Sequence, residues 1–95
     1  MIAVYAIAKV KADKITAFED VVKELVAKSR GDQGCISYAC GLVQGKENTY
    51  TFIEQWQSME DLKLHTQQPH FIEAGAKFAD ILSAELEINV VDYLA

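Results

Sequence analysis

The residues best suited to do chemistry in this sequence lie between positions 54 and 70. They are one carboxylate, Glu54, one indole, Trp56, and two imidazoles, His65 and His70. An imidazole suits proton transfer near neutrality because its unperturbed pKa is about 6.5. A carboxylate at its second nitrogen would select one tautomer and raise its basicity. These residue types therefore favour acid–base chemistry, provided that the fold brings them to one cavity.

Glu54 and Trp56 belong to a segment, 48–57, whose β-branched and aromatic residues predict a strand. Alternation along a strand places Phe52, Glu54 and Trp56 on the same face. A carboxylate in such an aromatic row is either a buried acid with a raised pKa or the partner of a Lys or His at the sheet rim. The sequence leaves both interpretations of Glu54 open.

The two histidines fall on either side of a predicted break between helices. His65 lies on a short helix that Ser58 is expected to cap, and its side chain should lean back toward the strand that precedes this helix. The ordinary alternative is a partly buried histidine whose hydrogen bonds are satisfied by the protein. His70 follows Pro69 at the start of the next helix, where the helix dipole disfavours imidazolium. Neutral His70 could donate to a substrate oxygen, or be a plain surface histidine. A metal held by His65, His70 and Glu54 has a suitable composition, but the spacing across the break at Pro69 does not ensure that the two rings converge, and a metal-free pocket is favoured.

Two more aromatic residues are candidates for the wall of the same cavity. Tyr38, on a strand expected over 34–43, could bring in a phenol, and Phe71 follows His70 on its helix. Ordinary core packing would explain either residue equally well.

The remaining pattern predicts a single α+β domain over residues 1–95 in the order β-α-β-β-α-β. The expected strands cover 2–10, 34–43, 48–57 and 85–93. The expected helices cover 13–30 and 69–82, and a short helix between them begins at Ser58 and breaks before Pro69. Asp13 is the expected N-cap of the first helix. This is the ferredoxin-like plan, an antiparallel sheet with helices on one face. Because the first strand is apolar on both faces, a symmetric partner should cover the other face, which predicts a homodimer.

Composition limits the classes of partner. The net charge is −5 and the nine basic residues are scattered, which argues against nucleic acid. No stretch has the length or flanks of a membrane or targeting segment, so a soluble cytoplasmic protein is expected. Cys35 and Cys40 lie on one predicted strand, on opposite faces and roughly 16 Å apart, too far for a disulfide. Two free thiols fit a reducing compartment.

These motifs resemble the antibiotic biosynthesis monooxygenase (ABM) domain family over essentially the whole chain. The shared features are the element order, Gly34 with Tyr38 four residues later, the Glu54-x-Trp56 signature, and His65 followed by His70-Phe71. The resemblance implies a dimeric α+β barrel. In several relatives, such a barrel oxygenates a quinol or another electron-rich aromatic compound without metal, flavin or haem.

Mapped onto this sequence, the resemblance makes His65 the base and Glu54 its orienting partner. The aromatic substrate would be bound by Trp56, Phe52, Tyr38, His70 and Phe71. Phe52 stands where polyketide oxygenases of the family carry Asn, and His65 stands where haem-degrading relatives carry Trp. Two alternatives stay open: an isomerase of a small carbonyl compound, which expects a polar pocket, and a non-catalytic, stress-related dimeric binding protein.

Overall fold

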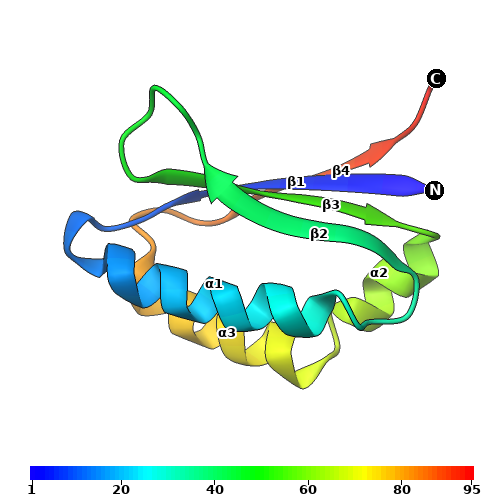
Figure 1. The fold of residues 1–95 in the computed structure, drawn as a ribbon, viewed down its shortest axis with the longest axis horizontal. Helices are drawn as coiled ribbons and strands as arrows, with labels where there is room; N and C mark the ends of the chain where they lie inside the picture. The colour runs from blue at the N-terminus through cyan, green and yellow to red at the C-terminus, as the bar shows by residue number, and fades with distance from the viewer.

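The computed structural model describes residues 1–95 and shows a four-stranded sheet with helices on one face (Figure 1). Its elements are β1 (Ile2–Lys9), a short 3₁₀ turn (Ala12–Lys14), α1 (Ile15–Ser29), β2 (Cys35–Leu42), β3 (Thr49–Trp56), α2 (Met59–His65), α3 (Pro69–Ile81) and β4 (Glu87–Asp92). The strand order is β2-β3-β1-β4, and all neighbours are antiparallel. The predicted ferredoxin-like plan is confirmed.

The helix starts were predicted with mixed success. Asp13 does not cap α1: it lies inside the 3₁₀ turn, and Lys14 occupies the N-cap position without a side-chain bond. Ser58 does cap α2, because its Oγ accepts the Asp61 N–H at 3.2 Å. Pro69 begins α3, where its missing N–H costs nothing.

The core fills the layer between the sheet and the helices α1 and α3. Phe18 of α1 is fully buried at its centre. Its ring lies within 4.8 to 6.4 Å, between centroids, of three others: Tyr50 and Phe52 from β3 and Phe78 from α3. Aromatic clusters of this kind hold helices to a sheet by burying large apolar areas. The short helix α2 lies beyond the end of α1, at one end of this layer (Figure 1).

The face of the sheet without helices is partly apolar and uncovered in the single chain. At its centre Tyr5 of β1 pairs with Ile53 of β3, and these side chains are 45% and 58% exposed. The symmetric partner expected for this face stays a prediction. Separately, none of the helices combines the length and apolarity needed to cross a membrane.

Because β2 contains a bulge, the prediction that the two cysteines lie on opposite faces of the sheet is wrong. The register shifts between Cys35 and Ser37, so Cys35 lies opposite Trp56 while Cys40 lies opposite Phe52. Partners directly opposite each other share a face of the sheet, and Trp56 and Phe52 both point toward the helices. The two thiols therefore lie on the same face, not on opposite faces; both are free, as expected.

The turn before β2 packs tightly against the start of α2. Gly34 has a positive φ of 78°, and a Cβ at this position would collide with the Asp61 carboxylate. Its carbonyl also accepts the N–H of Gln57 at 2.8 Å. This close approach brings Asp32, two residues earlier, to the end of α2 that carries His65.

Candidate active site

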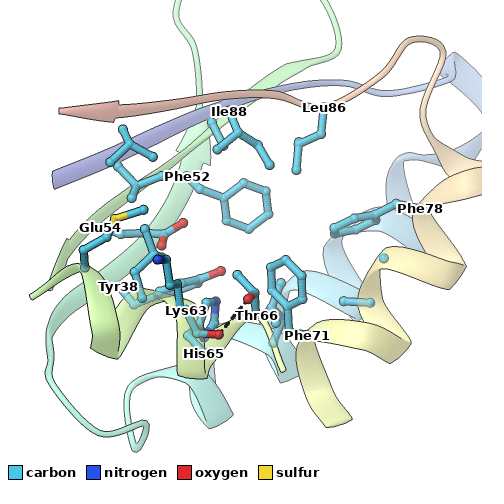
Figure 2. A pocket seen from close by; sticks show the side chains of 18 residues that line it. Tyr38, Phe52, Glu54, Lys63, His65, Thr66, Phe71, Phe78, Leu86 and Ile88 are labelled. Atoms are coloured by element: carbon cyan, nitrogen blue, oxygen red, sulfur yellow. Dashed lines mark hydrogen bonds between the residues drawn. The ribbon is translucent and has the colours of Figure 1, made fainter. Parts of the chain in front are cut away.

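A cavity of about 240 Å³ lies between the sheet and the helices α2 and α3 (Figure 2). Hydrophobic residues make up 13 of its 18 lining residues. Glu54, Tyr38 and His65 gather toward one end, and rings and aliphatic side chains, including Phe52, line the rest. An engineered cavity of about 150 Å³ already accepts benzene, so this one has room for a larger aromatic molecule.

The cavity has an open side at the edge strand β4. Ile88 and Val90 line the cavity yet remain about half exposed, so solvent reaches it along this strand. Lys63 of α2 is an exposed residue and the only cationic side chain of the lining. A ligand would therefore enter past apolar side chains and meet the polar groups at the inner end.

Glu54 is a buried acid, one of the two interpretations that the sequence left open. Its side chain is 6% exposed, and its Oε1 accepts the Trp56 Nε1–H at 2.9 Å. It forms no ion pair, and burial raises the pKa of Glu54 to about 7 despite the lowering effect of the indole hydrogen bond. At neutral pH this carboxyl therefore exists in both forms, and its neutral form is a proton donor.

This raised pKa predicts how stability depends on pH. The folded state holds the Glu54 proton more tightly than the unfolded chain does, so the free energy of unfolding should fall as pH rises from 4.5 to about 7. Glu54→Gln stays neutral and keeps a carbonyl for Trp56. We expect the variant to match the wild type near the lower end of that window and to exceed it above pH 7 by up to about 3 kcal/mol. Urea denaturation of both proteins across this range tests the difference; a constant difference would contradict it.

His65 is held by Asp32 and not, as predicted, by Glu54. The ring is 2% exposed, and its Nδ1 lies 2.6 Å from Asp32 Oδ2. An acidic oxygen accepts, so Nδ1 carries the proton and Nε2 keeps its lone pair. Nε2 is buried and has no hydrogen-bond partner. Burial lowers the pKa of His65, while Asp32 opposes that change.

Aromatic rings surround the His65 imidazole on several sides. Its centroid lies 4.7 Å from Trp56, 5.1 Å from Phe71 and 5.4 Å from Tyr38. The Tyr38 phenol is buried, and desolvation together with the nearby Glu54 raises its pKa, so it stays protonated as a donor. These neighbours exclude water from the ring and keep it in the neutral form that can accept a proton.

The structure separates the predicted substrate-binding residues into two groups. Tyr38, Phe52 and Phe71 line the cavity together with Glu54 and His65. Trp56 is fully buried outside the cavity lining, where its indole donates a hydrogen bond to Glu54 and its ring packs against His65. His70 also lies outside the cavity lining. The geometry therefore disfavours direct contact of Trp56 or His70 with a substrate in this cavity.

His70 instead contacts the same carboxylate as His65. Its Nε2 lies 2.8 Å from Asp32 Oδ2, and its side chain is 13% exposed. The ligand atoms of Asp32, His65 and His70 lie within 4.8 Å of one another, a two-imidazole, one-carboxylate set. The oxygen–nitrogen separations are hydrogen-bond distances, whereas tetrahedral metal ligands lie roughly 3 Å or more apart. The arrangement therefore fits shared protons better than a bound metal.

Comparison with known proteins gives the family. A family model described as antibiotic biosynthesis monooxygenase matches residues 1–77, most of the chain. The chain belongs to this family. The match includes every polar residue of the candidate site and ends before β4, which forms the open side of the cavity.

Individual relatives agree with this assignment. The ABM chain is 34% identical over 88 residues to a Bacillus subtilis (strain 168) protein named "Putative monooxygenase YcnE", with 93% of each chain covered. Among solved structures, a conserved protein from Methanosarcina mazei Go1 has a TM-score of 0.91 at 29% identity, covering 95% of this chain and 89% of that one. A protein from Caulobacter crescentus CB15, described as a "putative antibiotic biosynthesis monooxygenase", has a TM-score of 0.93 at 30% identity, covering 99% and 90%.

Asp32 is the site residue of this ABM domain that the sequence analysis missed. It lies 33 positions before His65, in the turn between α1 and β2. A signal was present: β2 and β3 were predicted to form a hairpin, and the residues before the first strand of a hairpin lie beside those after the second. That rule places Asp32 near the start of α2, although it does not indicate which side chain it meets.

Proposed function

We propose that this ABM domain is a monooxygenase that oxidises a quinol or another electron-rich aromatic compound with molecular oxygen, without a cofactor. The observation that carries the proposal is the unpartnered Nε2 of His65, on a ring that lines a largely apolar cavity and is held by Asp32. Such a base can take a proton from a weakly acidic hydroxyl or ring carbon when water is excluded.

The reaction balances without an added reductant. His65 Nε2 accepts a proton from the substrate, and the resulting anion passes electrons to oxygen until a carbon–oxygen bond forms. The peroxide anion takes the proton back from His65. The oxygenated carbon then loses its remaining proton together with hydroxide, so that one oxygen atom stays in the substrate as a carbonyl and the other leaves as water. Neutral Glu54 lines the same cavity and would donate the proton that helps hydroxide depart, then take up the proton that the oxygenated carbon loses, so that it returns to its starting form.

The composition of the cavity supports an aromatic substrate over the alternative isomerase function. A small carbonyl isomerase would need several polar groups for its substrate, whereas 13 of the 18 lining residues here are hydrophobic. Phe52 and Phe71 offer faces against which a planar ring can pack. The remaining alternative, a non-catalytic binding protein, predicts ligand binding without turnover.

Oxygen uptake with a panel of hydroquinones and anthrones, measured with a metal chelator present, tests the function. Oxygen-dependent turnover that is equal with and without chelator would support the proposal. Turnover that disappears with the chelator would contradict its cofactor-free part. Folded protein that consumes no oxygen, yet binds the same compounds or converts a small ketone under anaerobic conditions, would favour one of the two alternatives.

We also propose that the protein is a homodimer whose sheets pack face to face. The uncovered face of the sheet carries Tyr5 and Ile53 at its centre, whereas exposed apolar patches on monomers are usually small. A second copy would bury this face symmetrically and would leave the cavities on the helix side of each sheet.

A further inference from the structure

Both histidines of the chain meet on one carboxylate oxygen. His65 Nδ1 and His70 Nε2 lie 2.6 and 2.8 Å from Asp32 Oδ2, and the sequence contains no third histidine. The three residues come from the turn after α1, the end of α2 and the first turn of α3. Because a carboxylate oxygen only accepts, each of these two ring nitrogens carries a proton when the rings are neutral.

The two rings open onto different spaces. His65 lines the aromatic cavity, whereas His70 lines a small, separate groove between α1 and α3, together with Glu24, Glu73 and Lys77. His70 is also the more exposed of the pair, at 13% against 2%. Asp32 therefore joins a partly exposed imidazole to an almost fully buried one.

We propose that His70 is a positioning residue that, through Asp32, makes the basicity of His65 depend on protonation at this groove. The inference rests on the proposed function, which makes His65 the base. While His70 is neutral, the full charge of Asp32 favours the imidazolium that His65 becomes when it accepts a substrate proton. A protonated His70 offsets that charge and adds a like charge, so His65 becomes a weaker base.

The charges around His70 agree with this direction of coupling. Asp32 of the turn and His65 of α2 face it most closely, Glu24 faces it from α1, and Glu73 and Lys77 face it from α3. Only Asp32 is within hydrogen-bond distance, so a proton added at His70 acts first on this carboxylate. His70 is among the groups that lower the pKa of His65, after burial.

Nuclear magnetic resonance of the two imidazoles tests the coupling without any substrate. With only two rings, long-range proton–nitrogen spectra assign each tautomer directly. At a pH of about 8 we expect the Nδ1–H form of His65 and the Nε2–H form of His70. Because the two rings share Asp32, the His65 signals should report two protonation events on acidification and not one.

The variant His70→Gln separates coupling from simple packing, because glutamine keeps an N–H donor for Asp32 but cannot be protonated. The His65 signals should then report a single event, with a midpoint about one pH unit higher than in the wild type, since no cation competes at the carboxylate. Lys77→Gln is the control, because it changes the charge of the same groove without altering a residue that contacts Asp32. It should move the His65 midpoint by only a small fraction of the shift expected for His70→Gln.

Three results would overturn the proposal: an Nε2–H tautomer for His65, equal His65 midpoints in the wild type and His70→Gln, or spectra of the purified protein that change when chelator is added. The last would assign the three ligand atoms to a metal. If the coupling is present but the hydroquinone panel gives no turnover, the inference about His65 and His70 stands and the proposed monooxygenase function fails. The two ideas are thus distinguishable.

Discussion

His65→Gln should lower kcat/KM for oxygen-dependent turnover by about 10²- to 10⁴-fold, the contribution of a positioned general base. Glutamine fills similar space and can still donate an N–H to Asp32, but it has no lone pair that accepts a proton at neutral pH. Oxygen uptake at saturating and limiting substrate would separate kcat from KM. A loss carried mainly by kcat is expected, because the base acts on the bound substrate.

Two companion variants make this result specific. Asp32→Asn removes the buried charge that holds the Nδ1–H tautomer, so it should lower kcat in the same direction but by a smaller factor. Gln67→Ala changes an exposed residue just beyond α2, outside the cavity lining, and should retain wild-type activity. Turnover of His65→Gln at the wild-type rate, with an unchanged circular dichroism spectrum, would remove His65 from the mechanism.

Ile53→Glu should dissociate the proposed homodimer and weaken its Kd by ~10³-fold or more. Ile53 lies at the centre of the uncovered face, between Tyr5 of β1 and Ala39 of β2. In a symmetric interface the substitution would bury two unpaired carboxylates, each at a cost of several kcal/mol. The single chain should still fold, because this side chain is 58% exposed in it.

Ile72→Glu is the matched control for this experiment. Ile72 is 59% exposed and lies on α3, on the opposite side of the molecule from the uncovered face. Multi-angle light scattering at micromolar concentration should give a dimer for the wild type and for Ile72→Glu, and a monomer for Ile53→Glu. A monomeric wild type, or dimers in all three cases, would show that this face is not the interface.

Local sequence patterns were sufficient to predict the secondary structure of this chain. Helical spacing of apolar residues in α1, the Ser58 cap and Pro69 at the start of α3 act over a few residues, and each is confirmed. Predictions failed where a neighbouring segment changed the local pattern. The register shift between Cys35 and Ser37 leaves Ile36 as an extra residue in β2, and it therefore puts Cys35 and Cys40 on the same face of the sheet instead of on opposite faces.

The sequence by itself determined that Glu54 lies on the face of its strand shared with Phe52 and Trp56, because side chains alternate along any strand. Only the tertiary structure decided which acid holds His65. Glu54 is nearer in sequence, yet its Oε1 accepts the hydrogen bond of Trp56, while Asp32 reaches both imidazoles from a distant turn. Hydrogen bonds depend on where side-chain atoms lie in space, and the packing of the β2 turn against α2 sets those positions.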